Sequence, residues 1–305
     1  MDRRFYFREL NDNGLSNMSE SNSKSSRRGV IEIKNQRDQI LTQLRQMKSV
    51  GGRAKLGRFI AEGVDLCHRA LKYGAGLEAL ICTPRFADSE EGLALRDAVD
   101  EECLTYVCSQ GLLNKCLEAK PTPSCVGIVS FQTDLGDDLL RKALDKKREE
   151  GQAFLLAVDQ GDYADNLGML LRSAEAAGVD GVLLSKGTVD PFHRRVTRGS
   201  RGATFKLPLA IDVDLEHSIS LAQELGYQVV TTSANVEVPH YQVDYTRPTL
   251  IIVGNEHYGI QPQLIEQSNM CVKIPMHGLI NSLNISVAAS ILLFEAQRQK
   301  QSLKI

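Results

Sequence analysis

From Ala153 to the end of the chain, short apolar runs alternate with helical patterns. The strand-like runs read FLLAVD, GVLLSK, FKLPLAI, YQVVTTS, LIIVGNE and CVKIPM. Helical patterns occupy residues 166–178, 191–201, 214–225, 261–268 and 284–300. Because apolar strands that alternate with helices are typical of a parallel sheet covered on both faces, this half predicts an α/β domain over residues 153–305. Such sheets bind their ligands at the carboxyl ends of the strands.

Residues 30–135 predict a second, smaller α/β domain. Its patterns are an amphipathic helix in RDQILTQLRQM, a strand and a helix that ends at Gly74 in RFIAEGVDLCHRALKYG, and strands in LEALICT, CLTYVCS and SCVGIVSFQT. A charged helix over 139–152 has few apolar positions, so we interpret residues 136–152 as a linker. Residues 1–29 include a Ser/Asn-rich stretch that is typical of a disordered tail.

Composition excludes several classes of protein. The net charge is −2, so RNA or DNA binding requires local basic patches. Seven Cys without any CxxC pair indicate reduced, mostly buried thiols and no zinc site. No signal-peptide run and no stretch of ~20 apolar residues is present, which predicts a cytoplasmic protein without a membrane anchor. The motifs GxGxxG, GxxxxGK[ST], HExxH and GxSxG are also missing. The common dinucleotide-binding, nucleoside-triphosphate-binding, zinc-protease and esterase classes therefore lack their signatures here.

Polar residues follow the first strand of the larger domain, in DQGDYADNLGMLLRSAEAAG. Asn166 comes after a loop, and Arg172 lies near the start of the next helix. A cation there opposes the helix dipole, which favours an anionic partner for Arg172. The alternative is a surface arginine paired with Glu175 or Asp165.

Two further strand ends carry similar chemistry. In IIVGNEHYGI, Gly254 permits a close backbone approach before Asn255 and Glu256, although these two residues could equally be caps of a loop. In VKIPMHGLINSLN, a loop leads into the last helix, and backbone amides at a helix N-terminus bind electron-rich groups. This start offers three possible N-caps, Asn281, Ser282 and Asn284, where a helix needs one.

Two basic segments contain no acidic residue. HRRVTRGSRGATFK carries Arg194, Arg195, Arg198, Arg201 and Lys206, and RQMKSVGGRAKLGR carries Arg45, Lys48, Arg53, Lys55 and Arg58. In a helix, Arg194, Arg198 and Arg201 would share one face. Either segment alone could be a solvated surface, but two such segments in a chain of net charge −2 favour phosphate binding.

Three segments, in this order and spacing, resemble the motifs of the SpoU/TrmH family: NLGMLLRSAEAAG, VGNEHYGI and IPMHGLINSLNISVAASILLFEAQRQ. That family comprises S-adenosylmethionine-dependent RNA 2′-O-ribose methyltransferases of the SPOUT superfamily. The segment QLRQMKSVGGRAKLGRFIAEGVDLCHRALKYG is similar to the ribosomal-protein-like substrate-binding domain of the rRNA-modifying branch. The resemblance covers about residues 30–305. It implies a parallel sheet with a deep trefoil knot, a homodimer whose active sites are completed across the interface, and S-adenosylmethionine bound in the knot.

The resemblance also implies roles for individual residues. Catalytic positions are Arg172, Asn166, Glu256, Ser282 and Asn284. The cofactor-binding positions are Thr232, Ser233, Ala234, Gly254, Asn255, Ile274, Met276 and Leu283. The two basic segments, rather than the resemblance, supply the RNA-binding candidates Arg53, Lys55, Arg58, Arg194, Arg198 and Arg201, and no metal is expected. Asn281 keeps the role of helix cap, and none of the six histidines lies inside a motif core, so histidine catalysis is not expected.

The implied reaction moves a methyl group from a sulfonium to a ribose 2′-hydroxyl. A guanidinium has a pKa above ~12, so we expect Arg172 to bind the target phosphate or the developing alkoxide. The extra N-terminal domain favours rRNA over tRNA as the substrate. The alternatives are a non-catalytic RNA-binding paralogue and a different α/β enzyme that uses a nucleotide cofactor.

Overall fold

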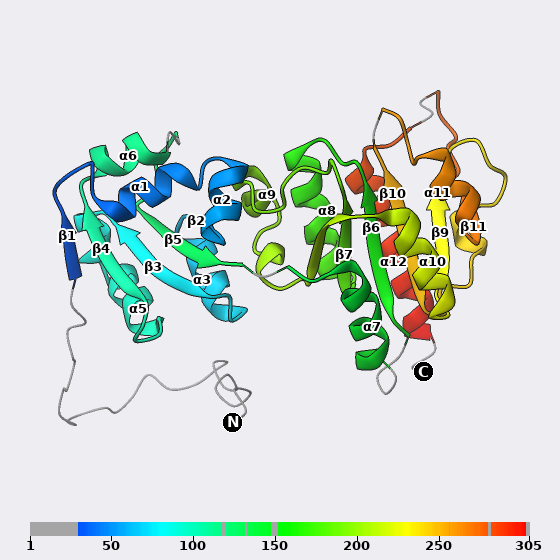
Figure 1. Ribbon diagram of the computed structural model, residues 1–305, viewed down its shortest axis with the longest axis horizontal. Coiled ribbons are helices and arrows are strands. Elements are labelled where there is room, and N and C mark those ends of the chain that lie inside the picture. Colours follow the sequence, from blue (N-terminus) through cyan, green and yellow to red (C-terminus); the bar gives the residue numbers. More distant parts are fainter. Residues whose placement is uncertain are drawn as a thin grey trace.

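The computed structural model describes residues 30–117, 120–131, 133–147, 152–255, 257–279 and 282–302. The predicted disordered tail, residues 1–29, lies outside them. The described chain forms two domains, each built on its own sheet, which lie side by side along the long axis of the molecule (Figure 1).

The N-terminal domain contains a mixed sheet in the order β1-β4-β3-β5-β2, in which β5 runs antiparallel to β3 and β2. Its strands are β1 (Val30–Ile33), β2 (Arg58–Glu62), β3 (Leu77–Cys82), β4 (Leu104–Cys108) and β5 (Cys125–Ser130). Its helices are α1 (Gln39–Gln46), α2 (Val50–Leu56), α3 (Val64–Lys72), α4 (Pro84–Ala87), α5 (Glu90–Ala98) and α6 (Gln110–Leu117).

The predicted patterns of this domain correspond to α1, β2, α3, β3, β4 and β5. Gly74 has a φ of +67°, a left-handed conformation that glycine adopts readily just after the end of α3. The thiols of the seven cysteines are free, and six of the seven are buried, as predicted. The apolar pattern did not single out the short elements β1, α2, α4, α5 and α6.

The C-terminal domain confirms the predicted parallel sheet. Its order is β11-β9-β10-β6-β7-β8, and every neighbouring pair is parallel. The strands are β6 (Phe154–Asp159), β7 (Gly181–Ser185), β8 (Leu209–Val213), β9 (Gln228–Thr232), β10 (Thr249–Gly254) and β11 (Met270–Val272). The helices are α8 (Ala164–Ala176), α9 (Arg194–Gly199), α10 (Leu215–Glu224), α11 (Pro262–Gln267) and α12 (Ile285–Ser302). Single 3-10 turns are η1 (Ala203–Phe205) and η2 (His240–Gln242). The trefoil knot that the resemblance implies stays a prediction.

The helix α7 (Gly136–Lys147) connects the two domains in the sequence, but it is more than a linker. Leu139, Leu140 and Ala143 are buried and join the core that covers one face of the C-terminal sheet. The interpretation of this helix as a charged linker therefore needs correction, because three apolar positions on one face are enough to dock a short helix.

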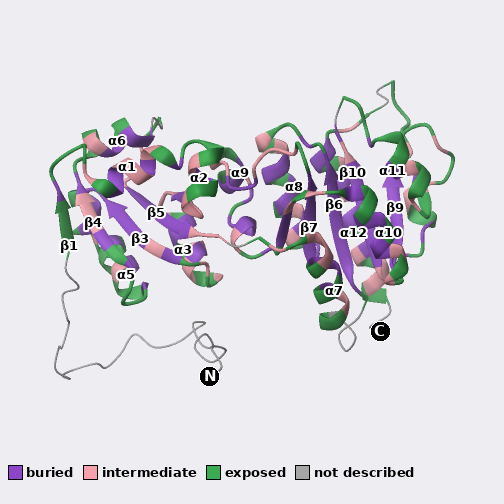
Figure 2. Ribbon diagram, viewed as in Figure 1, coloured by how far each residue is buried: buried purple, intermediate pink, exposed green. Residues whose placement is uncertain are grey.

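The two domains share a continuous apolar core. Phe59 and Phe131 from the N-terminal domain meet Phe192 and Phe205 from the C-terminal domain, with ring centroids 5.1 Å apart for Phe59 and Phe192 and 5.7 Å for Phe59 and Phe205. Buried residues of both sheets belong to the same cluster (Figure 2). Burying aromatic rings on both sides fixes the relative position of the two sheets.

None of the described helices is long and apolar enough to cross a membrane. Among the described residues, no group of three or more His, Cys, Asp or Glu side chains could hold a metal ion.

Candidate active site

Two of the predicted strand ends lie next to each other in the sheet. The last residues of β10 and β6, Gly254 and Asp159, are direct partners in the parallel register. Asp159 is buried, and its carboxylate accepts hydrogen bonds from Gln261 N at 3.0 Å and Gln261 Nε2 at 2.9 Å. This carboxylate therefore ties the loop after β10 back to the end of β6.

Gly254 is required by the same loop. A Cβ atom at Gly254 would lie 2.4 Å from the backbone of Gly259 and Ile260, where no side chain fits. The chain folds back there through a bridge between Asn255 and Gly259. The glycine permits this close approach of two backbone segments, while the approach of a ligand to Gly254 stays a prediction.

Asn255 joins the loop after β10 to the loop after β6. Its Nδ2 donates to Gln160 O and to Asp162 Oδ2, both at 2.7 Å, and its Oδ1 accepts from His257 N at 2.8 Å. The buried side chain is therefore fully used inside the protein, and the backbone carbonyl of Asn255 accepts from Gly259 N at 2.8 Å, so this residue shapes the loop. Glu256 lies outside the described residues.

Asn284 caps the last helix and reaches the first motif. Its Oδ1 accepts from Ser286 N at 2.9 Å, and its backbone carbonyl accepts from Ala288 N. Its Nδ2 donates to Asn166 Oδ1 at 2.9 Å. The helix cap is thus Asn284 rather than Asn281, which lies outside the described residues, and the same side chain brings two distant motifs together.

A cavity of about 520 Å³ surrounds this asparagine pair. Four of the predicted site residues line it together: Asn166, Ser282, Leu283 and Asn284. Five polar residues that were not among the predicted catalytic or cofactor-binding positions also line it: Asp162, Tyr163, Asp165, Arg195 and His257. Most of these are sequence neighbours of Asn166 or Glu256, so extending each motif by a few residues would have found them.

His257 lines the cavity, although no histidine was expected at the site. Its Nε2 lies 3.0 Å from the hydroxyl oxygen of Tyr163, which also lines the cavity. This contact connects the loop after β10 with the start of α8.

Arg172 lies on the exposed face of α8 and does not line this cavity. The alternative of a surface ion pair is excluded, because Asp165 binds Arg195 and Glu175 binds Lys206. Among the described residues Arg172 has no ion-pair partner. The helix begins at Ala164, so Arg172 is in its second half and, contrary to the prediction from the sequence, does not oppose the helix dipole; an anionic partner for it stays a prediction.

The remaining cofactor candidates follow β9 and β11. Val272 pairs with Thr232 in the parallel register, and Ser233 N donates to Val272 O at 2.9 Å. Thr232, Ser233 and Ala234 therefore lie beside the loop that carries Ile274 and Met276. Since β9 also neighbours β10, these loops and Gly254 share the carboxyl edge of the sheet.

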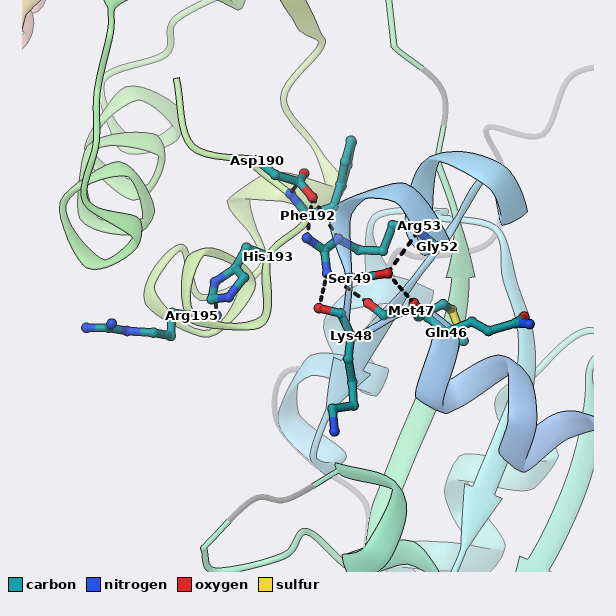
Figure 3. A network of polar contacts seen from close by, with 10 residues as sticks. All are labelled: Gln46, Met47, Lys48, Ser49, Gly52, Arg53, Asp190, Phe192, His193 and Arg195. Carbon is teal, nitrogen blue, oxygen red and sulfur yellow. Dashed lines mark hydrogen bonds and ion pairs between the residues drawn. The ribbon is translucent and has the colours of Figure 1, made fainter. Parts of the chain in front are cut away.

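The prediction that Arg53 contacts an RNA phosphate needs correction. Its side chain is only 4% exposed and lies between the domains, where Nε donates to Asp190 Oδ2 at 2.7 Å (Figure 3). Nη1 donates to Met47 O at 2.8 Å and to Lys48 O at 3.0 Å, and Nη2 faces Asp190 at 2.5 Å. A phosphate cannot reach this buried guanidinium, so Arg53 is part of the domain interface and not a phosphate contact.

The other basic candidates divide into paired and accessible residues. Arg194 donates to Glu62 and to Leu117 O, which uses every nitrogen of its guanidinium, and Arg58 pairs with Glu78 at 2.5 Å. Burial raises the pKa of Glu62, against the opposing effect of Arg194. Lys55, Arg198 and Arg201 are exposed, and of the six candidates these three are accessible to a phosphate, although Arg201 lies 3.6 Å from Asp65.

Comparison with known proteins is consistent with this geometry. Residues 153–294 match the SpoU rRNA Methylase family. A 23S rRNA (guanosine-2′-O-)-methyltransferase RlmB of Pseudomonas aeruginosa is 34% identical over 169 residues, 55% of this chain and 67% of that enzyme. An uncharacterized tRNA/rRNA methyltransferase of Synechocystis is 28% identical over 89% of this chain and 95% of its own length.

Solved structures share both domains. The crystal structure of an AdoMet-bound rRNA methyltransferase from Sinorhizobium meliloti is 28% identical, with a TM-score of 0.75 over 88% of this chain and 98% of that chain. AviRb of Streptomyces viridochromogenes, at 24% identity, has the same fold with a TM-score of 0.76 over 87% of this chain and 99% of its own. The class that fold and site define is that of the RNA methyltransferases. The chain belongs to the SpoU family.

Proposed function

We propose that this protein transfers a methyl group from S-adenosylmethionine to a ribose 2′-hydroxyl of rRNA. The observation that carries the proposal is the hydrogen bond between Asn284 and Asn166, which brings the first and third motifs into one polar cavity. The relatives named above support the substrate class, since RlmB acts on 23S rRNA and the Sinorhizobium enzyme is an rRNA methyltransferase.

The residues at the carboxyl edge of the sheet fit S-adenosylmethionine. The partly exposed apolar side chains of Ile274, Met276 and Leu283 suit an adenosine, and the backbone near Gly254 and Thr232 offers polar groups at the same edge. When bound, the cofactor supplies a methyl group that its sulfonium charge has already activated.

The chain's own groups would then align and stabilise the ribose. Asn166, Ser282 and Asn284 position the ribose hydroxyl within the cavity, because each presents a polar side chain there. Arg172 is on the same helix as Asn166 but does not line the cavity, so its side chain would have to turn toward the hydroxyl to stabilise the alkoxide that develops as the proton leaves. Glu256, next to the buried Asn255, is assigned a positioning role from its place in the second motif.

A homodimer would complete the site. Val287 and Phe294 on α12 are 47% and 46% exposed, and with Ile291 they follow one helical face. An exposed apolar ridge on the last helix fits a second copy of this chain. We assign the dimer interface to this ridge.

Gly254→Ala is expected to weaken cofactor binding by at least ~10-fold, because the added Cβ forces the loop after β10 away from its position. Isothermal titration calorimetry with S-adenosylhomocysteine measures this loss. Gly51→Ala is the matched control, since a Cβ there meets no atom within 4 Å. Equal affinities for the two variants would contradict the role of this loop.

The function is tested by incubating the full chain and labelled S-adenosylmethionine separately with deproteinised rRNA and tRNA. We expect label in rRNA, at a position that resists alkaline cleavage because its 2′-hydroxyl is blocked. Label in tRNA alone would mean that the substrate is tRNA and not rRNA. RNA binding without label would indicate a non-catalytic paralogue, and thermal stabilisation by NAD or ATP but not by S-adenosylhomocysteine would indicate a different enzyme.

A further inference from the structure

A second hollow, of about 530 Å³, lies where the two domains meet. The N-terminal domain contributes Glu62, Asp65 and Leu66, and the C-terminal domain contributes Arg195, Arg198 and Arg201 from α9 and the turn after it. Asp165 and Arg195 line this hollow and also the active-site cavity. The two hollows therefore meet at the Asp165–Arg195 pair.

The exposed face of α8 forms one wall of this interdomain hollow. Asp165, Met169 and Arg172 are spaced by four and three residues, so they share one helical face, and all three are exposed. Asp165 and Met169 line the hollow, and Arg172 continues the same face one turn further along. Asn166, next to Asp165, is at one end of this face and Arg172 is at the other, so RNA in the hollow would lie between them.

The cations in and beside the hollow differ in how firmly they are held. Arg194 does not line the hollow; it is bound to Glu62, whose side chain is only 6% exposed, and this pair is fixed within the protein. Arg198 has no ion-pair partner among the described residues, and Arg201 lies 3.6 Å from Asp65. Arg195 and Asp165 are 61% and 57% exposed, and exposed pairs of this kind contribute little to stability. The Arg195–Asp165 pair can therefore open at low cost.

The geometry of this pair is that of a phosphate site. Arg195 Nε donates to Asp165 Oδ1 at 3.0 Å, and its Nη2 binds the other carboxylate oxygen. The same two parallel N–H groups bind two oxygens of a phosphate. The hydrogen bond from Arg195 lowers the pKa of Asp165, because it stabilises the charged carboxylate.

We propose that the Asp165 carboxylate occupies the position on Arg195 where RNA, when bound, places the phosphate next to the methylated nucleotide. When RNA binds, this phosphate displaces the carboxylate. This inference rests on the proposed function, since it names how the substrate enters that site. Arg195 then becomes the phosphate contact closest to Asn166, while Arg198 and Arg201 bind the phosphates that follow in the hollow. The displaced carboxylate turns toward solvent, with no covalent change.

The test compares Asp165→Asn and Arg195→Gln in the full chain. Dissociation constants for end-labelled, deproteinised large-subunit rRNA are measured over a series of salt concentrations. We expect Asp165→Asn to tighten binding by ~2- to 5-fold, because no carboxylate has to be displaced. We expect Arg195→Gln to weaken binding, with a salt slope reduced by about one. The double variant should behave like Arg195→Gln.

The exposed Lys142–Asp134 pair, which lines neither hollow, supplies the control variants Lys142→Gln and Asp134→Asn. Opposite shifts for the two members of the Asp165–Arg195 pair, and none for the control pair, support the exchange. Equal shifts, or none, would mean that the pair only ties α8 to α9 and would overturn it. If the two variants show these opposite shifts but the wild-type protein methylates no RNA, the proposed function is refuted and the RNA-binding exchange stands.

Discussion

Arg172→Ala is expected to reduce the rate of methyl transfer by at least ~100-fold while cofactor affinity stays close to that of the wild type. Arg172 is exposed on α8 and unpaired among the described residues, and both acids that could neutralise it hold other partners. Its charge is therefore free to stabilise an alkoxide, and removing it raises the barrier without touching the cofactor loops. Single-turnover methylation of rRNA and calorimetry with S-adenosylhomocysteine measure the two effects separately.

The matched control for Arg172 is Arg247→Ala. Arg247 is also an exposed arginine, but it precedes β10 and thus lies at the amino edge of the sheet, opposite the site. We expect this variant to keep its methylation rate. If Arg172→Ala lost cofactor affinity and kept its turnover rate, the assignment of Arg172 to the alkoxide would be wrong.

The C-terminal sheet could be predicted because its strands are buried on both faces. A buried strand such as β6 or β10 is a continuous apolar run, and the residue after such a run marks the carboxyl edge. The prediction that polar strand ends meet follows from this, and the register confirms it for Gly254 and Asp159. The same reasoning passed over α7, since a helix that docks with only one apolar face resembles a charged linker.

Local sequence patterns cannot reveal contacts between residues that are distant in the sequence. Arg53 and Asp190 are 137 residues apart, and nothing near Arg53 in the sequence distinguishes it from the exposed Lys55. Both lie in one basic segment, yet one is a buried interface residue and the other is open to solvent. Likewise, Asn281 and Asn284 are equally good caps by residue type, and the bond from Asn284 to Asn166 gives that side chain its second role.

The Arg53–Asp190 pair gives the largest expected effect on stability. Arg53→Met should lower the free energy of unfolding by ~3–5 kcal/mol, because it leaves the mostly buried Asp190 carboxylate and the Met47 and Lys48 carbonyls without their donor. For a chain of this size that corresponds to a fall in the melting temperature on the order of 10 °C. Urea unfolding and calorimetry measure both quantities.

A double variant separates the loss of charge balance from the loss of packing. Asp190→Asn keeps the Oδ1 atom that accepts from Phe192 N at 2.8 Å, but it removes the negative charge next to Arg53. Combining it with Arg53→Met leaves no unpaired charge, so the double variant should be more stable than the sum of the single losses predicts. Lys142→Gln, which breaks an exposed pair, should leave the unfolding midpoint unchanged. If Arg53→Met cost no more stability than Lys142→Gln, the buried pair would not hold the domains together, and the interface would depend on its four phenylalanines and the Arg194–Glu62 pair instead.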